Sequence, residues 1–207
     1  MTMCSRRFAI IALALLLSSC GGPATNPDPN HTHADFGMWV DGREIDFSAE
    51  TYMSGSSAEE QDDGHGHTHR HPSLHLHDGN GHVIHRHKPG LPFKEFSDSI
   101  GLQFRGNTCY SLSHPGKGTL SGSGGFVCPI TPLRLFVNDM EQPFDLRYVF
   151  KDLDRIFITN APDRASVDIQ MQHLTDDACL YSRTCPERGD PPSENCIADP
   201  AVPCVEN

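Results

Sequence analysis

The motifs that most often mark an enzyme are missing from this 207-residue chain. It has no Gly-x-Ser-x-Gly elbow, no Walker loop and no His-Glu-x-x-His helix, which excludes the usual hydrolase, nucleotide-binding and zinc-protease signatures. None of the eight cysteines forms a Cys-x-x-Cys pair, so a dithiol redox centre and a zinc ribbon both fit poorly. A cupin-like site could begin at His75-Leu76-His77, but the glutamate that should follow is absent. We therefore do not expect an enzyme.

Basic side chains are scarce, because 16 lysines and arginines stand against 27 acidic residues. Arg6 and Arg7 lie in an N-terminal segment that we expect to be removed, and 16 less these 2 leaves 14 basic residues and a net charge of −13. Such a surface repels nucleic acid and anionic lipid, so we expect neither as a partner. It favours cations.

The apolar run at residues 8–17 is too short to cross a membrane as a stable helix. It follows the basic pair at residues 6 and 7, and Leu17-Ser18-Ser19-Cys20 resembles the bacterial lipobox. In that motif the cysteine receives fatty acyl chains such as palmitate and becomes the mature N-terminus. We therefore expect a signal peptide over residues 1–19, lipidation of Cys20 and an extracytoplasmic lipoprotein held at a membrane by its lipid anchor.

Residues 73–87 carry the clearest chemical pattern. Two runs of alternating residues flank the turn signal Asp78-Gly79-Asn80-Gly81, which predicts a β-hairpin. Each arm carries a His-x-His pair, and alternation along a strand points both members of a pair to one face. The four hairpin histidines are His75, His77, His85 and His87.

The register of this hairpin decides whether the two pairs meet. An even-numbered loop would put the pairs on opposite faces of the sheet, whereas an odd-numbered loop sets His75 opposite His85. The odd register also gathers Leu74, Leu76 and Ile84 on the other face. We predict the odd register, with an apolar inner face and the four histidines outside.

Paired imidazoles on one sheet face indicate a transition-metal site, because neutral imidazole suits Zn and Cu and two such arms supply three or four nitrogens. We expect the four hairpin histidines to bind Zn or Cu. The auxiliary, looser ligands are His65, His67, His69 and His71, from a polar segment that we predict to be a mobile loop. Asp78 is most simply a turn residue, with a second possible role in orienting an imidazole.

Two alternatives stay open at this point. His31 and His33 could add ligands if the first strand lies beside the hairpin, although we favour the interpretation that they belong to the tether. The whole protein could instead be an interaction module that recognises an envelope protein, with its histidines forming a polar or pH-responsive face.

Periodicity predicts the remaining elements. Residues 34–40, the turn Asp41-Gly42 and residues 43–48 form a first hairpin, and residues 93–100 form a helix between Pro92 and Gly101. We predict further strands at residues 102–105, 133–137, 146–150 and 155–159.

The six cysteines that remain after processing are an even number, as expected for disulfides in an oxidising compartment. Cys109 with Cys128 would close a Gly/Ser-rich loop. The other four, Cys179, Cys185, Cys196 and Cys204, would pair within the tail, and the sequence does not choose among their three connectivities.

Lys-Asp-Leu-Asp-Arg-Ile-Phe-Ile-Thr at residues 151–159 resembles the closing turn and strand of β-grasp proteins, and residues 93–102 resemble the helix that crosses their sheet. His-Ala-Asp-Phe at 33–36, Leu-His-Leu-His-Asp at 74–78 and Val-Ile-His-Arg-His at 83–87 resemble a group of His-rich secreted bacterial lipoproteins. The resemblance implies an architecture and no activity.

The expected fold class is α+β, with a small β-grasp-like mixed sheet, one main helix and a disulfide-rich irregular C-terminal tail. The expected order is a signal peptide (1–19), a flexible tether (20–32), the β-grasp-like domain (33–160) with its His-rich loop (54–72), and the Cys-rich tail (161–207).

Overall fold

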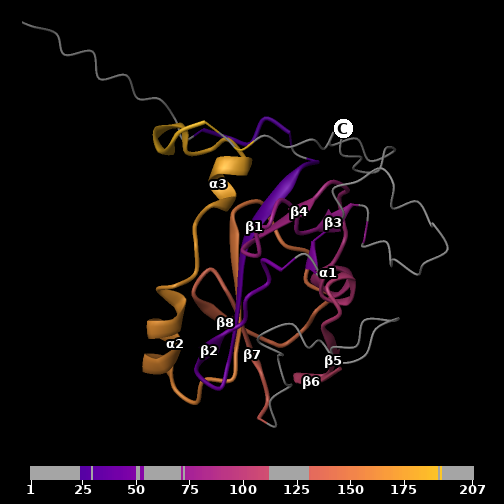
Figure 1. Cartoon of the computed structure of the whole chain (residues 1–207), viewed down its shortest axis with the longest axis vertical. Helices are drawn as coiled ribbons and strands as arrows, with labels where there is room; N and C mark the ends of the chain where they lie inside the picture. The colour runs from indigo at the N-terminus through magenta and orange to yellow at the C-terminus, as the bar shows by residue number, and fades with distance from the viewer. Residues whose placement is uncertain are drawn as a thin grey trace, which may run out of the picture.

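The computed structural model describes residues 24–28, 30–49, 52–53, 71, 73–111, 131–190 and 192. Within these ranges the protein is α+β, as predicted, and is built on a mixed seven-stranded sheet (Figure 1). The predicted signal peptide with Cys20, the loop histidines His65, His67 and His69, and the cysteines Cys128, Cys196 and Cys204 all lie outside the described residues.

The main sheet has the order β3-β4-β1-β9-β7-β8, and β2 pairs with the far end of β1. Its strands are β1 (Thr32–Val40), β2 (Arg43–Glu44), β3 (Leu74–His75), β4 (Val83–Arg86), β7 (Arg134–Val137), β8 (Met140–Gln142) and β9 (Asp154–Thr159). Only β1 and β9 run parallel among the paired strands described, and they lie at the centre.

The remaining elements are short. A separate two-stranded sheet joins β5 (Gln103–Arg105) to β6 (Thr108–Ser111). The helices are α1 (Phe93–Ser99), α2 (Arg164–Met171), α3 (Ala178–Tyr181) and a 3₁₀ turn, η2 (Pro186–Arg188). No helix in the described part of the chain has the length and apolar character needed to cross a membrane.

Local sequence explains the first hairpin and the first helix. Asp41 and Gly42 both have positive φ, 50° and 76°, as a type I′ turn between β1 and β2 requires. Pro92 precedes α1, where its missing N–H costs nothing, and Gly101 after the helix adopts φ 81°. Both predictions are confirmed, except that the second strand of the hairpin ends at Glu44 and does not extend to residue 48.

Alternation along β1 and β9 divides the protein into two cores. Phe36 points to one face, where its ring lies 5.2 Å from Phe96 of α1 and 5.2 Å from Phe47. Phe157 points to the other face, where it packs with Val167 and Met171 of α2. Helix α1 therefore covers one face of the sheet, and the segment after β9 covers the other (Figure 1).

The predicted strand at residues 146–150 is wrong. The chain pairs earlier, through β8, and Pro143 follows that strand immediately. The carbonyl oxygens of Leu146 and Tyr148 instead accept hydrogen bonds from the backbone N–H groups of Lys94 and Phe93, at 2.7 and 2.8 Å. These are N–H groups that the first turn of α1 cannot satisfy itself. The apolar alternation of this segment buries side chains without making a strand.

The segment after β9 is more ordered than its composition indicates. The side chain of Asp163 accepts from the backbone N–H of Ser166 at 2.8 Å and caps α2. A disulfide joins Cys179 to Cys185, which is a pairing within the tail as predicted. Cys109 is also disulfide-bonded, and its partner lies beyond the described ranges, so its pairing with Cys128 stays a prediction.

Candidate metal centre

The histidine hairpin adopts the odd register. His75 lies directly opposite His85, and Leu74 lies opposite Arg86. Leu74, Leu76 and Ile84 are fully buried in the same core as α1. The apolar set has therefore fixed the register as predicted, and the His-x-His pairs share the opposite face.

Strand β1 lies beside the hairpin and brings two more histidines to it. β1 pairs antiparallel with β4, and His33 stands directly opposite His85. The condition under which His31 and His33 could add ligands is thus met, and the assignment of both residues to the tether is wrong. The tether interpretation failed because the pairing of β1 with β4 joins segments some fifty residues apart, which alternation within either strand does not reveal.

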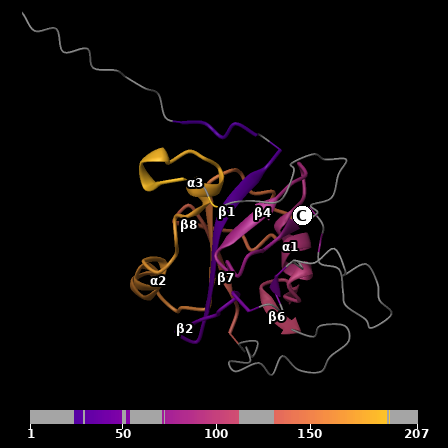
Figure 2. The ribbon, with the colours of Figure 1, turned by 45° about the horizontal axis from the view of Figure 1, so that its top comes forward.

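The histidine face is buried, so the prediction that these side chains lie outside is also wrong. Exposure is at most 3% for the four hairpin histidines and 8% or less for His31 and His33. The cover is α3 and the residue after it: the Tyr181 ring lies 4.7 Å from that of His85 and 5.6 Å from that of His33. Both ribbon views place α3 at the end of β1 that pairs with β4 (Figure 2).

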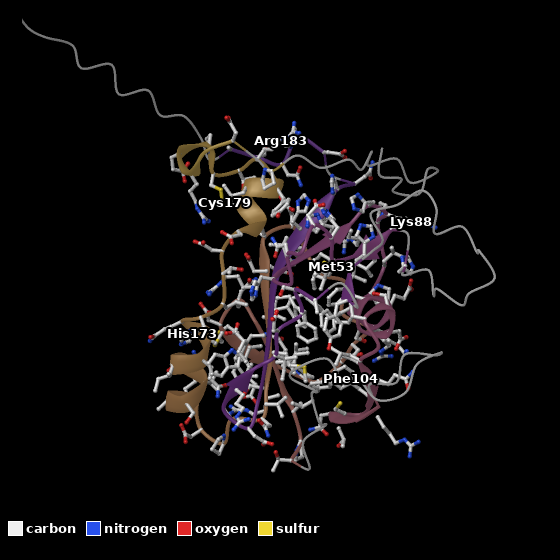
Figure 3. The ribbon with its side chains drawn as sticks, viewed as in Figure 1. Met53, Lys88, Phe104, His173, Cys179 and Arg183 are labelled. Carbon is white, nitrogen blue, oxygen red and sulfur yellow. A yellow bond between two sulfur atoms is a disulfide. The ribbon has the colours of Figure 1, made fainter. Side chains whose placement is uncertain are left out.

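Six imidazoles form a closed ring under this cover, which we call the histidine cluster. Going round it, the centroid separations are 4.4 Å for His31–His33, 4.8 Å for His33–His85, 3.8 Å for His85–His77, 5.7 Å for His77–His75, 5.0 Å for His75–His87 and 4.1 Å for His87–His31. Figure 3 shows side-chain nitrogen gathered between the labelled residues Cys179 and Lys88.

Three members of the cluster could hold a metal ion. His31, His33 and His85 each offer one ring nitrogen, and these three atoms all lie within 4.8 Å of one another. Nitrogens bound to one tetrahedral zinc at 2.0–2.1 Å stand about 3.4 Å apart, so binding requires only a modest contraction. We call these residues the first triad.

Hydrogen bonds fix which ring nitrogen carries the proton. Ser182 Oγ donates to Asp152 Oδ1 at 2.6 Å, so it must accept from His33 Nδ1, which lies 2.7 Å away. His33 therefore bears its proton on Nδ1 and presents Nε2 as a lone pair. A ligand histidine whose other nitrogen donates to an oriented acceptor is the usual arrangement in metal sites.

Two hairpin histidines are oriented in the same way. His77 Nδ1 donates to Asp78 Oδ2 at 2.6 Å, and His75 Nδ1 donates to the carbonyl oxygen of His71 at 3.1 Å. Asp78 also forms the turn, with φ 57°, so it has both of the roles that the sequence suggested. His75 and His77 thus keep Nε2 as a lone pair.

Burial keeps the imidazoles of His75, His85 and His87 neutral. It lowers the pKa of His75 to about 3, with a smaller contribution from the nearby His77. The pKa values of His85 and His87 are also lowered well below the ordinary value, again chiefly by burial and then by neighbouring histidines. Neutral imidazole is the form that binds a metal ion.

Two further histidines of the described ranges, His71 and His173, direct their rings away from the cluster. His71 directs its ring to Glu95, with Nε2 3.0 Å from Oε2, and reaches the cluster only through its carbonyl oxygen. The ring of His173 lies 5.2 Å from Trp39, on the face covered by α2. Ser182, Asp152 and Tyr181 were missed by sequence reasoning, and no local signal marks them, because each meets the cluster through long-range contacts.

The chain matches no protein-family model, no curated protein and no solved structure. The candidate site is therefore interpreted from its own geometry.

Proposed function

We propose that this protein is a non-catalytic transition-metal-binding lipoprotein that holds zinc or copper in the histidine cluster. The observation that carries the proposal is the first triad, three buried histidine nitrogens within 4.8 Å of one another. The burial of all three rings, the lowered pKa of His85 and the Ser182 hydrogen bond to His33 support ligation.

The donor set limits the choice of metal. Imidazole nitrogen suits zinc and copper, whereas magnesium and calcium need oxygen ligands. Copper should outcompete zinc in a test tube because divalent copper binds nitrogen sites more tightly. The physiological ion is therefore the one found in protein purified from its native envelope without a histidine tag.

The membrane anchor is a separate part of the proposal. It is supported by the lipobox-like segment that ends at Cys20, together with the disulfide between Cys179 and Cys185, which fits an oxidising compartment. A Cys20→Ser variant should lose acylation and remain an unprocessed precursor. A processed, acylated form of that variant in the detergent phase would overturn the lipid anchor and leave the metal site untouched.

The competing function is an envelope interaction module whose histidines form a polar, pH-responsive face. That function needs the imidazoles at the surface, and their exposure of 8% or less does not supply such a face. If the folded protein binds neither zinc nor copper, the interaction-module function replaces metal binding as the proposed function.

The decisive experiment separates the cluster from the loop histidines. In a full-length background with His65, His67 and His69 replaced by Asn, zinc affinity is measured by competition with a chromophoric chelator. His33→Asn should weaken binding at least a hundredfold, whereas His82→Asn is the matched control, because His82 lies in the hairpin loop and outside the cluster.

Metal binding should also stabilise the fold. An ion that binds only the folded protein adds about 2.7 kcal/mol at a hundredfold excess over its dissociation constant. If the background binds no zinc or copper, or if His33→Asn binds both as tightly as His82→Asn, the triad is not the site.

A further inference from the structure

We propose that the histidine cluster holds a second transition-metal ion on His75, His77 and His87, beside the ion of the first triad, so that the protein carries a two-metal centre. The inference rests on the proposed function, because it assumes that the first triad binds a metal. It concerns the three histidines that the first ion leaves unused, which we call the second triad.

The six imidazoles are too many and too spread out for one ion. A zinc site takes four ligands, and the first triad already supplies three of them. Among the residues that the structure describes, only the first triad has all its ligand atoms within 4.8 Å of one another. The second triad therefore lies to one side of the first instead of completing a single shell of six.

Two ring spacings in the second triad, both measured from His75, match the spacing of rings that bind one ion. His75 stands between the other two rings, with centroids 5.7 Å from His77 and 5.0 Å from His87. Two imidazoles bound through nitrogen to one tetrahedral ion, with bonds of 2.0–2.1 Å, have centroids about 5 Å apart. The second triad is more open than the first, so it should close further on binding and bind more weakly.

Two of the three members of the second triad, His77 and His87, have buried ring nitrogens without a hydrogen-bond partner in the described part of the chain. These atoms are His77 Nε2 and both ring nitrogens of His87. Asp78 holds the proton of His77 on Nδ1, and the His71 carbonyl holds that of His75 on Nδ1, which leaves Nε2 of each as a lone pair. Buried polar atoms without partners are rare in folded proteins, and a metal ion is a partner for such a lone pair.

The two triads adjoin at two places. The His77 ring lies 3.8 Å from that of His85, and the His87 ring lies 4.1 Å from that of His31. Each contact joins one member of the second triad to one member of the first. Two bound ions would therefore be neighbours within one buried compartment, close enough for two copper ions to interact magnetically.

The first test counts ions. The full chain with Asn at positions 65, 67 and 69 is loaded with zinc, dialysed and analysed for metal and protein. We expect two zinc ions per chain, bound in a tight and a weaker phase, and one ion in the His75→Asn/His87→Asn variant, which should keep the tight phase. His33→Asn should lose the tight phase, and His82→Asn should retain both ions.

The second test uses divalent copper and electron paramagnetic resonance. Two equivalents should give a half-field signal from a coupled pair, and one equivalent, or the His75→Asn/His87→Asn variant, should give only the signal of isolated copper. If that variant does not fold, as judged by circular dichroism, the single variant His87→Gln takes its place in both tests.

One ion per chain in the background overturns the second site while leaving the proposed function intact. Weakening of a single phase by every cluster variant would show one ion shared by all six rings, and it also overturns the second site. Absence of zinc and copper at any concentration tested would instead overturn the proposed function itself.

Discussion

Ser182 offers the sharpest test of how the fold prepares a ligand. Its hydroxyl is 1% exposed and connects His33 Nδ1, at 2.7 Å, to Asp152 Oδ1, at 2.6 Å. Ser182→Ala removes the acceptor that holds the His33 proton on Nδ1 and leaves the imidazole itself in place. Metal affinity should fall although no proposed ligand has been changed.

The expected loss is 10- to 100-fold in zinc affinity, the usual effect of removing the partner of a ligand histidine. This corresponds to about 1.4–2.7 kcal/mol of binding free energy. The metal-free protein should also lose about 1–3 kcal/mol of unfolding free energy, because Asp152 and His33 each lose a buried hydrogen bond. The variant should therefore show two separate losses. Its unfolding free energy without metal should be lower, and the increase in unfolding free energy on adding zinc should be smaller.

Competition with a chelator measures the affinity, and urea denaturation with and without zinc measures the two stabilities. Ser97→Ala is the matched control: Ser97 is equally buried, and its hydroxyl bonds to the Lys94 carbonyl within α1, away from the cluster. It should cost stability and leave zinc affinity unchanged. Equal zinc affinities for the Ser182 and Ser97 variants would refute the argument that Ser182 orients a ligand.

Three further predictions concern the surroundings of the cluster. Gly81→Ala should lower the unfolding free energy by about 1–3 kcal/mol, because the added Cβ would lie 2.5 Å from backbone atoms of Phe47 and Ser48; an unchanged urea midpoint would contradict this. Replacing Cys179 and Cys185 by Ser should lower the unfolding free energy by about 2 kcal/mol, by the chain-entropy relation for so short a loop. It should also speed zinc transfer to a chelator, since α3 covers the cluster. An unaltered transfer rate would show that the disulfide does not hold the cover in place. In chelator, the folded protein should lose stability as pH falls below about 6.5, because His75, with its folded pKa lowered to about 3, takes up a proton only on unfolding; each such histidine contributes up to about 1.4 kcal/mol per pH unit, and equal urea midpoints at pH 5 and 7 would refute the effect.

Much of the sheet could be predicted because its determinants are local. The Asp41-Gly42 turn, the alternation of β1 and the apolar residues flanking the histidines each fix conformation within a few positions. The strand predicted at residues 146–150 failed for the opposite reason. Its apolar alternation is real, but its carbonyl groups are used by the N-terminus of α1, and a pattern of side chains does not show where backbone groups pair.

The histidine hairpin was predicted and supplies four of the six members of the cluster, but the burial of those four side chains was not predicted. Histidines at alternate positions reveal their shared face, which is why His75 and His85 could be paired in advance. Nothing in the hairpin reveals that β1 lies on its other side and adds His33. Polar side chains were expected outside because imidazole is polar, yet a neutral ring with an oriented partner can be buried without holding a charge.

Asp35 explains why the cover could not be foreseen and how it is held. Its side chain is 2% exposed, and its Oδ1 accepts from the Thr175 hydroxyl at 2.9 Å and from the backbone N–H groups of Asp177 and Ala178 at 2.8 and 3.2 Å. Burial raises the pKa of this carboxyl, and the three hydrogen bonds oppose that rise. One carboxyl on β1, two residues from His33, thus fixes the start of α3 over the cluster. The partners are about 140 residues apart in sequence, and Thr175, Asp177 and Ala178 form no pattern of their own. These residues become hydrogen-bond partners only because the sheet brings Asp35 to them, so the burial of the histidines depends on the completed fold.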